Sequence, residues 1–328
     1  MYHFEDYTRY VTETIGARVP VVRAAERGTL SFTPYISDTC SASCRFCSEK
    51  LSNGAVAGAA LTVCEGYCEK LTAVLLAQRD RPMFLSVSGM EPTENVPQLA
   101  LVSEAVRRAV QGGCRIPERV MYTNLSGFTK DRERLIGLVR SLGLTRIECS
   151  RHHHDAAVCQ SIMRFRDGET IRANETFTQV VRQLLDIVPV TMVCVMQQTG
   201  VATPADAAAY LAFARENGVR RVVFRGLSVF SGTADGAAIA RYIAENRVET
   251  LDMLRALPPS FRLRSVTEGY YYYSFVYQYD DMEVLFEMSD YDQMHRVHAG
   301  TQRHKLIFYP NGELYCDWDR DPRARLTT

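Results

Sequence analysis

The chain lacks the features that mark membrane, secreted and nucleic-acid-binding proteins. Its 328 residues contain no long apolar run, so no transmembrane helix is predicted. Lysine and arginine together number 38, as do aspartate and glutamate, and this balance gives no bias toward nucleic acid or anionic lipid. The first residues show no basic segment followed by an apolar one, so no signal peptide is expected. We therefore predict a cytoplasmic protein without nucleic-acid or membrane partners.

The cysteines also lack the pattern of a secreted disulfide framework. Ten cysteines in 328 residues are too sparse for one. Three of them, however, lie within eight residues: Cys40, Cys44 and Cys47 have the spacing C-x-x-x-C-x-x-C. No second C-x-x-C or H-x-x-x-H segment lies nearby, whereas structural zinc sites need four ligands, usually as two pairs. This spacing favours a ligand set with three cysteines.

Three thiolates on one short loop suit an iron–sulfur cluster with one open corner. A [4Fe–4S] cluster usually takes four cysteines, so Cys40, Cys44 and Cys47 would leave one iron free for a small molecule. Phe46 lies directly before the third cysteine. A zinc loop and three buried thiols are the alternatives.

This spacing, with an aromatic residue at Phe46, resembles the signature of the radical S-adenosylmethionine (radical SAM) family. The resemblance implies a [4Fe–4S] cluster on the three cysteines and S-adenosylmethionine (SAM) chelated to the open iron through its amino and carboxylate groups. It also implies a 5′-deoxyadenosyl radical that abstracts hydrogen from a substrate. A flavodoxin- or ferredoxin-type electron donor would be the partner, and Phe46 would lie near the adenine.

Apolar periodicity predicts six alternating strands and helices, which means parallel strands with helices outside. The expected strands are 30–37, 83–88, 119–123, 146–150, 190–196 and 221–227. A last helix is expected over about 234–257. Fewer than eight units favours a partial (β/α)6 parallel barrel, the fold that the radical SAM resemblance also implies.

The pattern changes after Pro258-Pro259. Strands are expected at 261–266, 270–277, 282–286, 305–309 and 313–318, with Asn311-Gly312 as a hairpin turn. We therefore predict three parts: an N-terminal extension over 1–29, the partial barrel over 30–257, and a β-rich C-terminal cap over 258–328. The cap is expected over the open side or mouth of the barrel.

In parallel barrels the active site gathers at the C-terminal ends of the strands. Residues 88–92 follow the second strand and resemble the family's Gly-Gly-Glu-Pro motif, although Ser88 and Met90 depart from its two glycines. The alternative is an ordinary strand–turn–helix connection with a solvated Glu91. The SAM contacts expected from this motif, from the resemblance and from the strand ends are Phe46, Ser88, Gly89, Glu91, Ser150, Arg151 and Gln197.

Substrate contacts are expected at other strand ends and in the cap. These candidates are Asn124, His152, Arg225, Glu287 and Asp317. His152 begins the run His152-His153-His154, of which one histidine is expected to face the site. Cys316 is the candidate catalytic thiol, because a thiol facing a carbon radical can deliver a hydrogen atom; a cysteine filling a hairpin core is the alternative.

The predicted function is that of a radical SAM enzyme acting on a small polar metabolite such as a sugar, aminoglycoside, nucleoside or amino acid. The expectation that the chain has neither a long N-terminal domain nor a second cluster favours such a substrate over a peptide. Epimerisation, dehydrogenation, decarboxylation and elimination all remain open. The alternatives are a peptide-modifying radical SAM enzyme and a non-catalytic iron–sulfur or zinc-binding protein.

Overall fold

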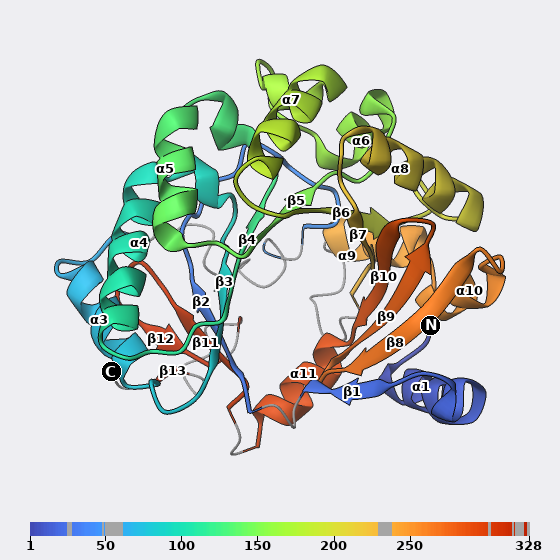
Figure 1. The fold of residues 1–328 in the computed structure, drawn as a ribbon, viewed down its shortest axis with the longest axis horizontal. Helices are drawn as coiled ribbons and strands as arrows, with labels where there is room; N and C mark the ends of the chain where they lie inside the picture. Colours follow the sequence, from blue (N-terminus) through green and yellow to red (C-terminus); the bar gives the residue numbers. More distant parts are fainter. Residues whose placement is uncertain are drawn as a thin grey trace.

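The computed structural model describes residues 1–24, 28–47, 49, 62–228, 238–300, 303–316, 318 and 325–326. These residues contain a 13-stranded sheet in the order β1-β8-β9-β10-β7-β6-β5-β4-β3-β2-β11-β12-β13. The sheet curves into an open horseshoe with helices along its outer side (Figure 1). We call the concave side, away from these helices, the inner face.

Six parallel strands form the centre of the sheet. They are β2 (Leu30–Pro34), β3 (Met83–Val87), β4 (Glu118–Thr123), β5 (Arg146–Ser150), β6 (Val190–Met196) and β7 (Arg221–Gly226). Each is paired in parallel with the next. The six strands predicted from apolar periodicity are therefore confirmed, and with them the partial parallel barrel.

The outer helices also follow the predicted alternation. They are α3 (Tyr67–Leu76), α4 (Val96–Gln111), α5 (Arg132–Leu142), α6 (Ala156–Met163), α7 (Asn174–Leu185), α8 (Pro204–Glu216) and α10 (Thr250–Ala256). Helix α9 (Ala238–Asn246) instead packs with Val195 and Phe46, apart from the outer core. The expected single helix over 234–257 is wrong in its described part, because Arg247 leaves the helix to bridge Gln197. The short helix α6 was not expected.

The C-terminal strands join both edges of this sheet rather than forming a separate layer. Strands β8 (Phe261–Glu268), β9 (Tyr272–Tyr279) and β10 (Met282–Ser289) extend the β7 edge. Strands β11 (Lys305–Phe308), β12 (Leu314–Tyr315) and β13 (Arg325–Leu326) extend the β2 edge. Helix α11 (Tyr291–His298) lies across the open side between the two edges (Figure 1).

The N-terminal segment packs beside the β8 edge. Helix α1 (Phe4–Arg9) continues as a π-helical stretch (Tyr10–Ile15), and β1 (Val21–Arg23) pairs in parallel with β8. Tyr7, Val11 and Ile15 are buried in the main core. Within the described residues, no helix is both long enough and apolar enough to cross a bilayer.

Alternation along the strands separates two apolar regions. Phe32, Leu85 and Ile147 belong to the large core between sheet and helices. A small second cluster of Val193, Val223 and Leu285 lies apart from it on β6, β7 and β10. Because successive strand side chains point to opposite faces, the second cluster marks the inner face.

One buried carboxylate fastens α1 to α11. Asp290 is 0% exposed, and its Oδ1 caps α11 by accepting from the N–H of Gln293 at 2.9 Å. Its Oδ2 accepts from the N–H of Phe4 at 3.1 Å, and its own N–H donates to the carbonyl of Tyr271 at 2.8 Å. Asp290 therefore joins three parts of the chain, two through its side chain and one through its backbone N–H.

We expect Asp290→Ala to lower the free energy of unfolding by about 2–4 kcal/mol, since it removes a helix cap and leaves a buried N–H unpaired. Urea unfolding followed by circular dichroism measures this loss. Glu5→Ala is the matched control: Glu5 pairs with Arg296 of α11 at 3.3 Å across the same helices, but on the surface. That change should cost less than about 1 kcal/mol. Equal losses in the two variants would contradict the assignment.

Candidate active site

The three cysteines of the loop follow β2 at its C-terminal end, and all are partly buried. Two N–H groups point at the sulfur of Cys40: the backbone N–H of Ala42 at 3.3 Å and the side-chain amide of Asn124 at 3.4 Å. Charged acceptors make the stronger hydrogen bonds, so this pair of donors suits a thiolate better than a thiol. Asn124, expected to contact substrate, instead contacts a cysteine of the loop.

The segment before Cys40 is bonded to the loop that follows β3. Ile36 N–H donates to the carbonyl of Ser88 at 2.9 Å, and Met90 N–H donates to the carbonyl of Ser37 at 2.9 Å. Glu91 N–H donates to the carbonyl of Thr39 at 3.0 Å. The Gly-Glu-Pro segment and the cysteine loop therefore form one backbone unit.

Gly89 is what allows the two segments to approach. Its φ is +136°, and a Cβ placed there would lie 2.9 Å from the backbone nitrogen of Ser37 and 3.0 Å from that of Ile36. Any side chain would therefore collide with the segment leading to Cys40. Gly89 acts on the site through backbone geometry.

The carboxylate of Glu91 lies beneath this unit and is 1% exposed. Its Oε1 accepts from the N–H and hydroxyl of Thr93 at 3.1 and 2.6 Å and from the hydroxyl of Thr123 at 2.6 Å. Its Oε2 accepts from the N–H of Asn124 at 2.6 Å. The carboxylate is buried and bonded within the protein, which gives no support to the expectation that it holds SAM directly; that contact stays a prediction.

Burial raises the pKa of both acidic groups of this unit, the Glu91 carboxyl and the Cys40 thiol. Burial raises the pKa of Glu91, although four donated hydrogen bonds oppose the shift. Burial, and then the charge of Glu91, raises the pKa of the Cys40 thiol to about 12. A cation at the loop would reverse the second effect, because metal coordination deprotonates a thiol outright.

His152 contacts the aromatic residue of the cysteine loop. Its ring meets that of Phe46 edge-on, with 4.9 Å between centroids. Its Nδ1 accepts from the backbone N–H of Val195 at 3.1 Å, so the proton of the neutral ring lies on Nε2. Burial, and then the charges of Arg151 and Arg225, lowers the pKa of His152 to about 3. His152 is therefore a neutral donor at physiological pH.

The expectation that Arg151 pairs with the SAM carboxylate is wrong. Arg151 is 1% exposed and donates to the carbonyls of Ile171 and Arg172 at 3.2 and 3.0 Å, with its guanidinium 4.9 Å from the centroid of the Phe177 ring. It lies in the helix layer because neighbours on a strand point to opposite faces. The same alternation puts the half-buried Ser150 on the inner face.

Gln197 is also held by the protein. It is 0% exposed, and its Oε1 accepts from the hydroxyl of Tyr242 at 2.6 Å. The ring of Tyr242, on α9, lies 4.4 Å from the guanidinium of Arg45 in the cysteine loop. Gln197 therefore supports α9 and the loop rather than contacting SAM. Sequence reasoning missed Arg45 and Tyr242, because no local pattern links residues so far apart in the chain.

Two expected substrate residues meet on the inner face. Arg225 donates twice to Oε2 of Glu287, at 3.0 and 2.8 Å, and Ser274 donates to Oε1 at 3.3 Å. Oε2 of Glu148 lies 3.6 Å from Arg225 and accepts no hydrogen bond among the described residues. We call Arg225, Glu287 and Glu148 the inner charged cluster.

Cys316 does not join this cluster. Cys316 packs against the large outer core together with Leu314. Tyr315, between them, packs with Tyr35 in a separate cluster. This position suits the hairpin-core alternative and gives no support to hydrogen-atom donation by Cys316, which stays a prediction. Asp317 lies outside the described residues.

The residues at the cysteine loop fit an iron–sulfur cluster. Two N–H donors at Cys40 are the kind of hydrogen bond that tunes cluster sulfurs. Among the described residues, no three Cys, His, Asp or Glu side chains converge tightly enough for a single metal ion. Such tight convergence is needed only for a single ion, because each cysteine of a cubane cluster binds a different iron.

Comparison with solved structures relates this arrangement to known folds. No sequence-family model matches the chain, and neither does any curated protein sequence. Native anSMEcpe with bound AdoMet is similar with a TM-score of 0.55 at 12% identity, over 91% of this chain and 77% of that one. Native anSMEcpe with AdoMet and the Kp18Cys peptide gives 0.53 at 12% identity, over the same 91% and 77%.

On the likeness to these two structures, the chain has the radical SAM fold. HemN from Escherichia coli, described as a radical SAM enzyme, is a weaker match, at 12% identity with a TM-score of 0.42 over 84% of this chain and 70% of that one. In the histidine-tagged form of anSMEcpe with bound AdoMet, the alignment spans only 50% of the matched chain, at 14% identity with a TM-score of 0.48 over 60% of this chain. At these identities the likeness concerns the fold, and activity has to be argued from the site.

We expect Gly89→Ala to abolish iron uptake by the cysteine loop and to destabilise the protein by about 1–3 kcal/mol, because a Cβ forces the loops apart. Iron content after anaerobic reconstitution and the melting temperature are the measurements. Gly137→Ala is the matched control, since nothing lies within 4 Å of its added Cβ. It should keep its iron and gain about 0.5–1 kcal/mol in helix α5. Wild-type iron content in Gly89→Ala would refute the packing argument.

His152 should make the protein sensitive to acid. Its folded pKa of about 3 lies below the unfolded value near 6.5, so the unfolded state binds the proton first. Stability is present above about pH 6.5 and falls on acidification, by up to about 1.4 kcal/mol per pH unit. In His152→Gln, which keeps an acceptor for Val195 N–H, urea unfolding between pH 7 and 4 should show a shallower loss. Parallel curves for the two proteins would exclude this role.

Proposed function

We propose that the protein is a radical SAM enzyme that holds a [4Fe–4S] cluster on Cys40, Cys44 and Cys47. The observation that carries the proposal is the three-cysteine loop at the end of β2, with Ala42 and Asn124 both donating to the sulfur of Cys40. When bound, the cluster and SAM supply reductive cleavage of the sulfonium and hydrogen abstraction from an unactivated C–H bond.

The residues available to SAM are fewer than the sequence indicated. Since the Glu91 carboxylate is occupied, the amino group of SAM would meet the backbone of 88–90 rather than that side chain. Ser150 on the inner face is positioned for a polar contact. Phe46 offers an apolar surface for the adenine, and neutral His152 can donate from Nε2 beside it.

The inner charged cluster supports a small polar metabolite as substrate. Arg225 is 32% exposed and Glu287 is 20% exposed at the side chain, so both reach the inner surface without being free in solvent. Oε2 of Glu148 is buried 3.6 Å from Arg225 and adds a second carboxylate to the cluster. Such a wall fits a sugar, aminoglycoside, nucleoside or amino acid, and the net reaction is left open among epimerisation, dehydrogenation, decarboxylation and elimination.

A peptide substrate is the second candidate. The observation that favours it is the likeness to anSMEcpe, one structure of which contains the Kp18Cys peptide. A flavodoxin- or ferredoxin-type donor and a cytoplasmic location complete the proposal. Turnover of candidate metabolites against short peptides, with 5′-deoxyadenosine as the readout, separates the two substrate classes.

The proposed function predicts that anaerobic reconstitution loads about four irons per chain, and that the visible absorbance bleaches on reduction. SAM and dithionite should then release 5′-deoxyadenosine. The variant with Cys40, Cys44 and Cys47 all changed to Ala should lose both iron and product. Cys64→Ala, another half-buried cysteine outside the loop, should keep both. Iron retained by the triple variant, or tetrahedral zinc bound by the wild type, would contradict the proposal.

A further inference from the structure

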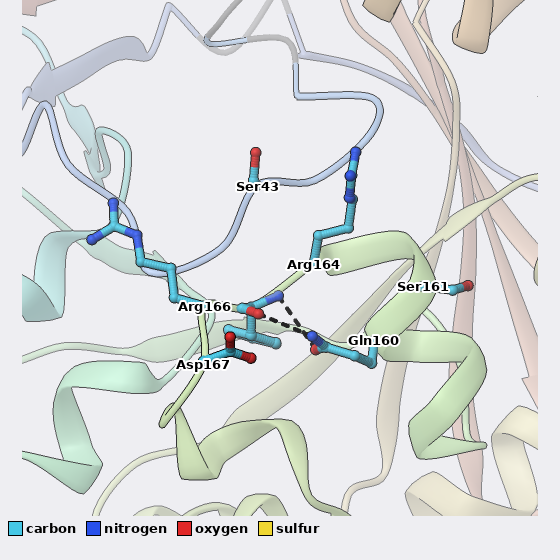
Figure 2. A pocket seen from close by; sticks show the side chains of 7 residues that line it. Ser43, Gln160, Ser161, Arg164, Arg166 and Asp167 are labelled. Atoms are coloured by element: carbon cyan, nitrogen blue, oxygen red, sulfur yellow. Dashed lines mark hydrogen bonds between the residues drawn. The ribbon is translucent and has the colours of Figure 1, made fainter.

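A pocket of about 540 Å³ opens beside the cysteine loop, between that loop and the end of α6 (Figure 2). Its lining residues are Ser43, Gln160, Ser161, Arg164, Phe165, Arg166 and Asp167. Ser43 comes from the cysteine loop itself, next to Cys44. The pocket therefore adjoins the loop that would carry the proposed cluster, and the proposed function assigns it no role.

Backbone hydrogen bonds fix this pocket to the loop. Ser43 N–H donates to the carbonyl of Met163 at 2.9 Å, and Arg45 N–H donates to that of Ile162 at 3.1 Å. In return, Arg166 N–H donates to the carbonyl of Ser41 at 3.0 Å. Residues 162–166 thus form an added edge on the cysteine loop, and their side chains move with it.

The turn that carries the arginines is itself braced. The amide of Gln160 donates to the carbonyl of Phe165 at 2.9 Å and accepts from its N–H at 3.3 Å (Figure 2). Arg164 ends α6 in the left-handed conformation, with φ of +54°. A non-glycine residue in this conformation is uncommon. The side chains of Arg164 and Arg166 lie on the side of the pocket where Ser43 lies (Figure 2).

The charge of this pocket is positive, although the whole chain has a formal net charge of +0. Arg164 and Arg166 are exposed, and neither forms an ion pair with another described residue. The acid in the pocket lining, Asp167, lies 3.8 Å from the guanidinium of Arg172 and is thereby offset.

We propose that Arg164 and Arg166 form the docking surface for an acidic one-electron carrier protein. The inference rests on the proposed function, because the carrier would deliver its electron to the cluster on the same loop. One electron leaves the reduced flavin or iron–sulfur centre of the carrier and enters the cluster, and no bond forms or breaks at the docking face. Complementary charge accelerates encounter and makes it dependent on ionic strength.

The test uses the reconstituted enzyme and a reduced flavodoxin of net negative charge. In Arg164→Glu/Arg166→Glu, the second-order rate of cluster reduction, followed by stopped-flow absorbance, should fall about ten-fold or more at low salt. The difference should shrink as salt screens the charges. Reduction by dithionite should be unchanged, and Arg164→Lys/Arg166→Lys should keep most of the wild-type rate.

The matched control is Arg262→Glu/Arg264→Glu on β8, which makes the same charge change at two exposed arginines with the same spacing. This control should be reduced at the wild-type rate. If Arg164→Glu/Arg166→Glu loses iron, Arg164→Ala/Arg166→Ala serves in its place, with a smaller expected loss.

Two results would overturn the docking proposal while the proposed function stands. One is an unchanged rate of reduction by flavodoxin in the Glu and Ala variants. The other is inhibition by inorganic phosphate well beyond that of chloride at equal ionic strength, which would make the pocket a small-anion site. A wild-type protein that takes up no iron would instead remove the proposed function, and the docking proposal with it.

Discussion

The buried carboxylate of Glu91 is the interaction on which the site depends most. It joins the loop after β3 to the end of β4 by accepting from Thr93, Thr123 and Asn124. Asn124 is thereby held where its amide reaches the sulfur of Cys40. Removing one member of a buried, fully bonded group leaves the others unpaired, at a cost of about 1–3 kcal/mol for each. A residue expected to bind SAM thus shapes the cluster site from beneath.

This arrangement also explains why the strand ends were easier to predict than the roles of their side chains. Apolar periodicity located all six central strands, and the ends of parallel strands meet at one edge. Which neighbour faces inward is a separate question. Ser150 and Arg151 are adjacent, so only one of them can face the inner surface. The alternation of strand side chains can be read from the sequence, and it places Ser150, not Arg151, on the inner face.

Other features depend on contacts that no local pattern carries. The pairing of 41–45 with 162–166 joins segments that are distant in the chain, and α6, which ends there, was not expected. The same holds for Arg45 against Tyr242. The C-terminal strands were located, but their pairing with both β7 and β2 follows from the unsatisfied edges of an open sheet, which favour added strands. Apolar periodicity locates strands in the sequence, but it does not say which edge of the sheet each strand joins.

Arg151 differs from Arg164 and Arg166 in what surrounds it. Arg151 is buried and has its guanidinium bonded to carbonyls, because an unpaired buried charge is too costly to keep. Arg225, partly exposed on the inner face, is paired with Glu287. Arg164 and Arg166 remain in solvent, where leaving a charge unpaired costs little. Buried, paired arginines such as Arg151 therefore belong to the structural framework of the fold. Positive side chains fixed beside the cysteine loop without a described carboxylate partner offer their charge to something outside the chain.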